Sequence, residues 1–296
     1  MQPQIVTVGV YLQNVNDIDV KSSIFMLDFY IWFRWKGPID PSASFEFTNV
    51  VERWGMTRET IYPAVVSLPD GSQYQCFHIQ GKFNHKFDLR EYPLDRQRLP
   101  IQVEDNQYQV DVMRYEADTA SSRYDLNISI PGWQIDGEQA EAQKYVYRST
   151  FGRPQAPGAN ETYSRFTYTL HISRPWWAYL FRMLVPLLVI IFSSLVVFFL
   201  SPMYADARTS IAITALLSAV ALHLTVSTDL PQVGYIRLID KIYNLAYAVI
   251  FVTLGESVVA IRMRDAGREQ RTVIMDRITL ITLAVITVVG LVYLIG

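Results

Sequence analysis

The positions of hydrophobic and polar residues divide the chain near Arg174 into two parts. Before that residue, short runs of β-branched and aromatic residues alternate with polar positions, and clusters of Pro, Gly, Asn and Asp separate the runs. Many short strands with such turns are typical of a β-sandwich. After Arg174, long stretches carry almost no charge. We predict a two-domain membrane protein, with an N-terminal immunoglobulin-like β-sandwich at residues 1–174 and a C-terminal four-helix transmembrane bundle at residues 175–296.

Four stretches of the second part have the length of a membrane span. A helix needs about 20 apolar residues to cross a bilayer. Residues 176–200, 236–261 and 274–295 meet this requirement with few charges. Residues 209–226 have a similar length but carry several hydroxyl groups. We therefore predict four transmembrane helices, of which the second is polar along part of its surface.

The orientation of these helices follows from the arginines in one loop. The segment RMRDAGREQR between the third and fourth spans carries four arginines, and such loops are found on the cytoplasmic side. Counting back through three spans places residues 1–174 outside. Trp176, Trp177 and Tyr179 then lie at the outer interface, where aromatic residues are common.

The polar side of the second span forms one stripe at helical spacing. Its members are Ser210, Thr214, Leu217, Ala221, Leu224 and Thr228. In lipid, buried hydroxyl groups need protein or water as partners. Two interpretations are open: a water-filled pore with a constriction at Leu217, or a helix contact through small residues. One stripe cannot enclose water, so a pore requires several subunits around an axis.

Two charges at the inner end of this span bear on ion selectivity. A ring of Asp206 carboxylates favours cations, whereas Arg208 opposes them if its side chain also faces the lumen. The sequence does not show which of the two points inward, and we predict cations. His223 lies about 240° around the helix from Leu217, away from the stripe. It is either a hydrogen-bonded packing residue or a proton sensor.

Charge, cysteine content and motifs exclude several other classes of protein. The net charge of −2 gives no reason to expect a nucleic-acid partner. Cys76 is the single cysteine, so no disulfide forms within the subunit. The four histidines lack metal-ligand spacing, and the sequence has no G-x-S-x-G motif and no phosphate loop. We predict no enzyme activity, no cofactor and no metal site.

Residues 87–99, FDLREYPLDRQRL, carry a resemblance to a known family. The core YPLDRQ at 92–97 resembles the signature loop of the Cys-loop receptor superfamily. Animal members flank this core with two cysteines, which His85 and Leu99 replace here. Arg174-Pro175 is similar to the family's junction before the first membrane helix. The chain thus resembles a pentameric ligand-gated ion channel of the prokaryotic type that lacks the Cys-loop disulfide.

The resemblance implies a homopentamer around a central pore and strongly favours the pore interpretation. The implied pore-lining residues are Asp206, Ser210, Thr214, Leu217, Ala221, Leu224 and Thr228. The implied coupling residues are Asp95, Arg174 and Pro231. The first two would form a charge-assisted hydrogen bond at the domain boundary, and Pro231 lies in the linker after the second span. The alternative is that Asp95 and Arg174 are ordinary solvated loop residues with no role in coupling.

The resemblance also implies an agonist site between neighbouring outer domains, formed by an aromatic box that often holds an amine by cation–π attraction. The residues at matching positions are Tyr30, Phe47, Glu104, Tyr108, Tyr147, Phe151 and Tyr163. Asn106 replaces the principal aromatic residue after the signature loop, and the family's Trp-x-Pro segment is missing. These departures leave the box incomplete, and each aromatic residue has core filling as its alternative role.

We therefore predict one subunit of a homopentameric, cation-selective ion channel that a ligand or protons open by acting on the outer domain. Its expected partners are four identical subunits, permeant ions, membrane lipid and a small-molecule, divalent-ion or proton agonist. The prokaryotic features predict the bacterial inner membrane, with residues 1–174 in the periplasm. The alternative is a membrane-anchored receptor that binds a ligand without conducting ions.

Overall fold

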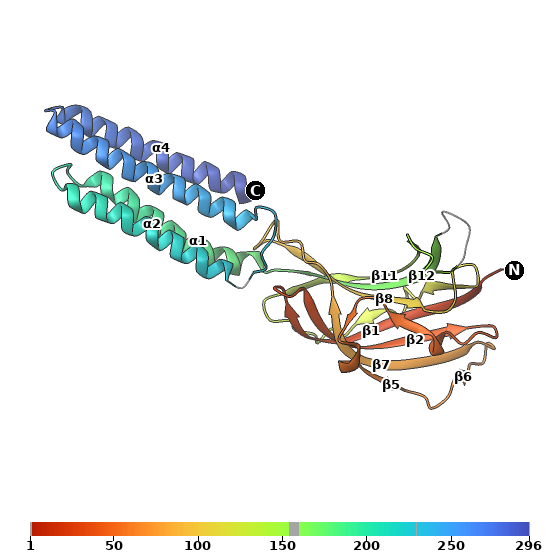
Figure 1. Ribbon diagram of the computed structural model, residues 1–296. Coiled ribbons are helices and arrows are strands. Elements are labelled where there is room, and N and C mark those ends of the chain that lie inside the picture. Colours follow the sequence, from red (N-terminus) through yellow and green to blue (C-terminus); the bar gives the residue numbers. More distant parts are fainter. Residues whose placement is uncertain (1, 154–159, 229, 296) are drawn as a thin grey trace. The chain divides into compact units, whose positions relative to one another are not determined.

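The computed structural model describes residues 2–153, 160–228 and 230–295, and the chain forms two compact units (Figure 1). The first unit comprises Met1–Phe87 and Arg96–Ser173, and it is built from strands. The second comprises Asp88–Asp95 and Arg174–Gly296, and it is built mainly from helices. The predicted fold class, a β-sandwich followed by four membrane helices, is confirmed at this level.

The strand unit contains two sheets, and the period-two pattern of the sequence agrees with strands that bury one face. Their strands are β1 (Gln4–Asp19), β2 (Ile24–Trp35), β3 (Phe45–Phe47), β4 (Val50–Val51), β5 (Thr57–Thr60), β6 (Val66–Ser67), β7 (Gln73–Asn84), β8 (Arg96–Asp105), β9 (Met113–Ala117), β10 (Arg123–Tyr124), β11 (Gln134–Tyr147) and β12 (Glu161–Ser173). The larger sheet has the order β10-β1-β2-β7-β4, with β5, β6 and β9 paired to its members. The smaller sheet has the order β11-β12-β8-β3.

The core of the strand unit is rich in phenylalanine rings. Phe47 is 3% exposed and packs edge-on against Phe29, Phe45 and Phe83. Aromatic pairs prefer such tilted or edge-on arrangements, and each ring buries a large apolar area. Three other rings enclose its side chain, so Phe47 fills the core in this structure, and its contact with a ligand stays a prediction.

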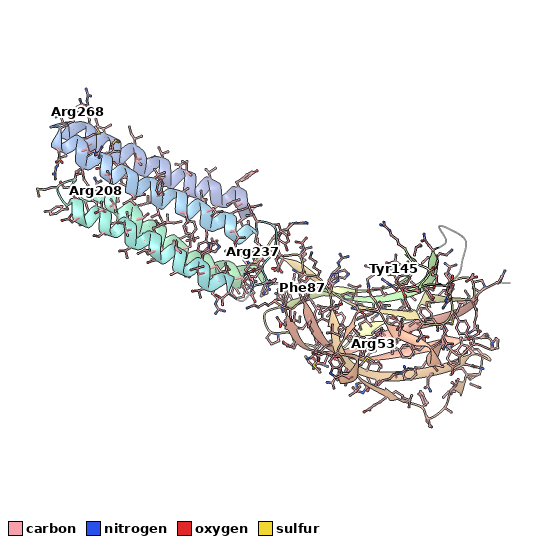
Figure 2. The ribbon with its side chains drawn as sticks, viewed as in Figure 1. Arg53, Phe87, Tyr145, Arg208, Arg237 and Arg268 are labelled. Atoms are coloured by element: carbon pink, nitrogen blue, oxygen red, sulfur yellow. The ribbon has the colours of Figure 1, made fainter. Side chains whose placement is uncertain are left out.

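The helical unit contains four long helices that run alongside one another in Figure 1. They are α1 (Trp176–Leu195), which continues as a 3₁₀ turn at Val196–Phe199, α2 (Ala205–Ser227), α3 (Leu238–Asp265) and α4 (Glu269–Ile295). All four are long and apolar enough to cross a membrane, so the chain is a multi-pass membrane protein. The side-chain view in Figure 2 labels Arg208 and Arg268 at one end of this unit and Arg237 at the other.

Two boundaries differ from the sequence-based expectation. The second helix begins at Ala205 rather than at residue 209, so Asp206 lies in its first turn, where a carboxylate interacts favourably with the helix dipole. The sequence assigns residues 88–95 to the outer domain, but they pack in the helical unit. Backbone N–H groups of Leu238 and Ile239, at the start of α3, donate to the carbonyls of Arg90 and Tyr92.

Candidate pore, coupling pair and agonist site

The seven predicted pore-lining residues all lie on the exposed surface of α2: Asp206, Ser210, Thr214, Leu217, Ala221, Leu224 and Thr228. The opposite side of the helix is buried through Ala212, Ala215 and Ala219. Leu217, in the middle of the exposed stripe, is 65% exposed. Within the described chain, the alanine side of α2, and not the hydroxyl stripe, therefore packs against the rest of the bundle.

Arg208 points into the bundle and away from this stripe. Its side chain is fully buried, and Nη2 donates to Oδ1 of Asp276 on α4 across 2.8 Å. Nε donates to the backbone carbonyl of Val197 across 3.1 Å. Glu256 of α3 is also buried and interacts with this ion pair. Asp206 remains exposed, so the structure separates the two charges that the sequence leaves together.

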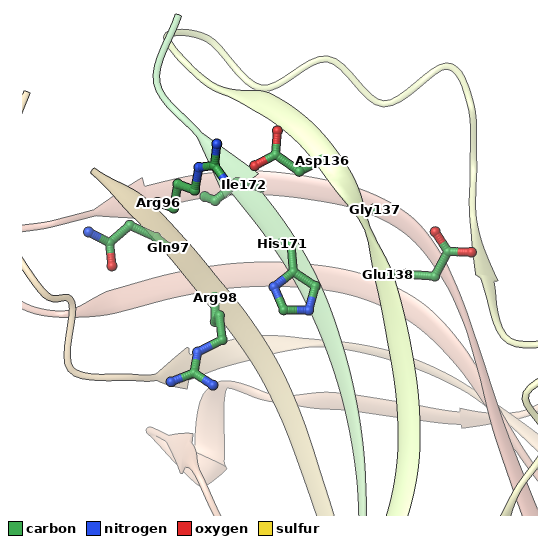
Figure 3. A pocket seen from close by; sticks show the side chains of 8 residues that line it. All are labelled: Arg96, Gln97, Arg98, Asp136, Gly137, Glu138, His171 and Ile172. Atoms are coloured by element: carbon green, nitrogen blue, oxygen red, sulfur yellow. The ribbon is translucent and has the colours of Figure 1, made fainter. Parts of the chain in front are cut away.

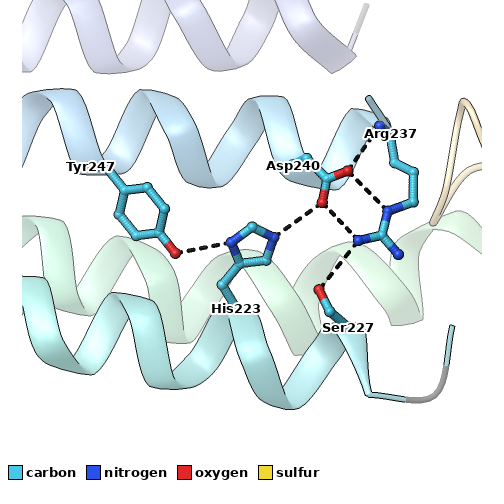
Figure 4. A network of polar contacts seen from close by, with 5 residues as sticks. All are labelled: His223, Ser227, Arg237, Asp240 and Tyr247. Atoms are coloured by element: carbon cyan, nitrogen blue, oxygen red, sulfur yellow. Dashed lines mark hydrogen bonds and ion pairs between the residues drawn. The ribbon is translucent and has the colours of Figure 1, made fainter. Parts of the chain in front are cut away.

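A polar network at the other end of the bundle joins α2 to α3 (Figure 4). His223 lies 2.9 Å from the Tyr247 hydroxyl through Nδ1 and 3.1 Å from Asp240 Oδ1 through Nε2. Its ring stacks on Tyr243, with ring centres 4.4 Å apart. Arg237 donates to both oxygens of Asp240. His223 is thus a hydrogen-bonded packing residue in this conformation and faces away from the stripe, as its position in the helix predicts.

The structure brings Asp95 and Arg174 together. Nε of Arg174 donates to Oδ1 of Asp95 across 2.9 Å, and their side chains are 8% and 1% exposed. The guanidinium also lies over the rings of Tyr92 and Tyr179, at 5.0 Å and 5.1 Å from their centres. The geometry fits a coupling pair, and its role in gating stays a prediction. Pro231 is half-buried in the linker that leads to α3.

That linker contacts the signature loop through a tyrosine. The backbone N–H of Leu89 donates to the Tyr235 hydroxyl across 2.9 Å. The Arg90 guanidinium lies 5.3 Å from the centre of the Tyr235 ring. The signature loop is therefore tied both to the start of α1, through Arg174, and to the segment between α2 and α3.

Glu104 and Tyr147 meet in the outer domain at one charged cluster. The Tyr147 hydroxyl donates to Oε2 of Glu104 across 2.8 Å, and Nε of Arg165 donates to Oε1 across 2.6 Å. The Arg165 guanidinium lies 3.4 Å from the centre of the Tyr145 ring. Burial, with the hydrogen bond to Glu104, raises the pKa of Tyr147 to about 12, so its hydroxyl remains a donor at neutral pH.

Tyr163 and Phe151 lie against the same cluster. Both rings contact Tyr147, with centres 5.8 Å and 5.2 Å away. The Tyr163 hydroxyl donates to Oε2 of Glu161, which is fully buried. Arg153 approaches the other Glu161 oxygen at 3.6 Å. Four of the predicted ligand residues, Glu104, Tyr147, Phe151 and Tyr163, are thus brought together.

The remaining predicted ligand residues lie elsewhere in the chain. Tyr30, on β2 of the other sheet, stacks on His78, whose Nε2 lies 2.6 Å from Asp28. Tyr108 is half-buried, and its backbone N–H donates to Asp105. In the subunit arrangement that the resemblance implies, Tyr30 would serve the site of a neighbouring chain, and that assignment stays a prediction.

Sequence reasoning missed Arg165, Tyr145 and Asp276. Arg165 follows Tyr163 by two residues on one strand, so the two side chains share a face of the sheet. That alternation could have placed Arg165 beside Tyr163 in the predicted site. For Asp276 the sequence offered only a weaker indication, namely a carboxylate near the end of an apolar span.

A separate hollow of about 490 Å³ opens on the smaller sheet (Figure 3). Its lining includes Arg96 and Arg98 from β8, Asp136 and Glu138 from β11, and His171 from β12. Charges of both signs line it, and it lacks the tyrosine and phenylalanine rings that a cation–π box requires. The aromatic cluster around Glu104 is the better agonist-site candidate.

Comparisons with known proteins show which proteins this chain resembles. No family model matches the chain. It is 22% identical over 304 residues to a proton-gated ion channel from Gloeobacter violaceus, covering 96% of this chain and 80% of that protein. It is 24% identical over 289 residues to an acetylcholine-gated chloride channel subunit from Caenorhabditis elegans, covering 88% of this chain and 62% of that protein.

A gamma-aminobutyric acid receptor subunit beta-like protein from Drosophila melanogaster is 25% identical over 170 residues, which cover 57% of this chain and 32% of that protein. These relatives have channel or receptor names in common, and the bacterial match spans both units. Across both units the chain is homologous to pentameric ligand-gated ion channels. Its homologues are ion channels and not enzymes. One of these relatives is a chloride channel, so the relationship leaves ion selectivity open.

Breaking the Asp95–Arg174 pair should destabilise this channel subunit. In Asp95→Ala, the Arg174 guanidinium stays buried without its carboxylate, and such a change costs about 3–5 kcal/mol. We expect a clear fall in the thermal unfolding temperature of the purified protein in detergent. Asp88→Ala is the matched control, because Asp88 lies in the same loop but is 59% exposed, beside an Arg90 that is 70% exposed. Equal stability of the two variants would contradict the prediction.

Proposed function

We propose that this chain forms a homopentamer whose five α2 helices line a cation-selective pore, and that a ligand or protons acting on the outer domain open it. The observation that carries the proposal is the position of Arg208. Its guanidinium is buried against Asp276, while Asp206 and the hydroxyl stripe stay exposed on α2.

The exposed stripe supports a pore. Its hydroxyl groups need partners in a membrane, and five copies facing a common axis would supply water as that partner. Leu217 stands between Thr214 and Ala221 on the stripe, so five leucines would narrow the lumen at one level. A ring of apolar side chains can stop conduction by excluding water.

The charges at the inner end support cation selectivity. Five exposed Asp206 carboxylates would form a negative ring at the cytoplasmic mouth, which attracts cations. Arg208 would not cancel that ring, because Asp276 holds its charge within the bundle. Arg264 and Arg268, at the ends of α3 and α4, support a cytoplasmic location for this end of the helices. We place residues 1–174 on the periplasmic side of a bacterial inner membrane.

Protons are one candidate agonist, and the Gloeobacter relative carries the name of a proton-gated channel. In this chain, burial raises the pKa of the Asp105 carboxyl. Acidification therefore protonates Asp105 at a higher pH than an ordinary aspartate. Its carboxylate accepts hydrogen bonds from the Ser44 hydroxyl and from the backbone N–H groups of Gln107 and Tyr108. Protonation would weaken those bonds beside Glu104.

Purified chains reconstituted in bilayers should carry cation currents, and Asp206→Asn should lower the single-channel conductance. A charge about 4 Å from an ion in water changes its energy by about 1 kcal/mol, so the decrease should be several-fold at low salt. Asp265→Asn is the control, because this exposed aspartate lies at the end of α3 beside Arg264. The alternative, a non-conducting receptor, predicts no current across a screen of pH and ligands.

Asp276→Asn should reduce cation selectivity. The change leaves Arg208 without its charged partner, and an unpaired buried charge is costly enough to drive the side chain toward water. We expect the reversal potential under a salt gradient to move toward that of chloride. Arg208→Gln in the same background should restore it. A folded Asp276→Asn channel with unchanged selectivity would show that Asp276 does not control the charge at the mouth.

Leu217→Thr should produce leaky or easily opened channels. Threonine is polar, so five of them would admit water to the constriction and lower the barrier to opening. Open probability at rest, measured in bilayers, checks this outcome. Val220→Thr is the control, because Val220 is partly exposed on α2 but lies outside the stripe. Normal gating in Leu217→Thr would place the gate elsewhere.

A further inference from the structure

The charged cluster of the outer domain already contains a cation. The Arg165 guanidinium lies over the Tyr145 ring at 3.4 Å from its centre and pairs with Glu104 at 2.6 Å. The side chains of Arg165 and Glu104 are 10% and 3% exposed. A ring face and a buried carboxylate are the two elements that recognise an ammonium or guanidinium ligand.

Both oxygens of Glu104 are engaged by groups of the same chain. Oε1 accepts from Arg165, and Oε2 accepts from the Tyr147 hydroxyl, which also receives a hydrogen bond from Nη2 of Arg165. The second carboxylate of the cluster, Glu161, has Tyr163 and Arg153 as partners. An external amine would therefore have to displace Arg165 before it could pair with Glu104.

The strand register shows that the cluster is a built site and not part of the sandwich core. Phe166 of β12 pairs with Val103 of β8, and both side chains are fully buried in the core. Side chains alternate along a strand, so the next residues along, Arg165 and Glu104, point to the other face of the sheet. That face would normally be solvated, and aromatic rings from β11 and β12 cover the charges there instead.

We infer that Arg165 is the specificity-determining residue of this site, because its guanidinium occupies the place of a cationic ligand. The site thus has the chemistry of a guanidinium-binding box and is filled from within its own chain. External amines and guanidinium compounds are excluded while Arg165 is present. That this cluster is the agonist site rests on the proposed function, whereas its binding chemistry does not.

Removing the tethered cation should convert the cluster into a site for a free one. Arg165→Ala leaves Glu104 buried without a charge partner, so the variant should unfold at a lower temperature than the wild type. A covalent tether supplies an effective concentration in the millimolar range. N-ethylguanidinium chloride at millimolar concentration should therefore raise the unfolding temperature of full-length Arg165→Ala in detergent, relative to sodium chloride at equal ionic strength.

Two further variants decide whether the rescue uses the box. In Arg165→Ala with Glu104→Gln, the probe loses its carboxylate, and in Arg165→Ala with Tyr145→Leu, it loses its ring. We expect both double variants to lose most of the stabilisation by N-ethylguanidinium. Equal stabilisation of Arg165→Ala and either double variant would overturn the inference.

The wild-type protein gives a test that does not depend on a variant that folds. N-ethylguanidinium at the same concentrations should leave its unfolding temperature unchanged, because Arg165 fills the box. Stabilisation of the wild type through this site, abolished by Tyr145→Leu, would overturn the inference. Currents recorded from the same preparations separate the two claims: rescue without any current contradicts the proposed channel, and currents without rescue contradict the occupied box.

Discussion

The ion pair between Arg208 and Asp276 fixes which charges α2 exposes near its N-terminal end. A charged side chain in an apolar environment is costly unless a partner compensates it. Pairing with α4 turns the guanidinium into the bundle and leaves Asp206 exposed on the opposite side of α2. A chloride channel is among the relatives of this chain, so where such charges point matters more than whether they are present.

The need of a buried charge for a partner also accounts for contacts in other parts of the chain. Asp95 with Arg174, Glu104 with Arg165, and Arg208 with Asp276 are buried arginine–carboxylate pairs that join residues 79, 61 and 68 positions apart. Each pair connects two segments, namely the signature loop and the residues before α1, two strands, or two helices. Loss of one partner leaves the other charge buried and unpaired, which is costly. Each pair therefore holds its two segments together more firmly than a surface pair would.

Local patterns predicted the parts of this structure that depend on local physics. The β-rich runs and the four apolar spans follow from side-chain periodicity and length, and the polar stripe of α2 follows from helical spacing. The family motif pointed to Asp95 and Arg174. Periodicity cannot supply a distant partner, so it left Arg208 ambiguous and gave no role to Asp276. The motif match to Phe47 gave no sign of its burial, because a motif does not show which face of a strand other rings enclose.

The position of Asp276 on α4 would give the lipid environment an influence on the inner mouth of the proposed pore. The outward surface of α4 is apolar, with exposed side chains at Ile274, Ile278, Ile281, Val285, Val288 and Val292. A change in bilayer thickness alters the tilt that such a helix prefers, at a modest energetic cost per ångström. Any shift of α4 carries the Asp276 carboxylate with it, and so alters how firmly the arginine on α2 is held. Hydrocarbon thickness would then tune the electrostatic field that permeating ions meet.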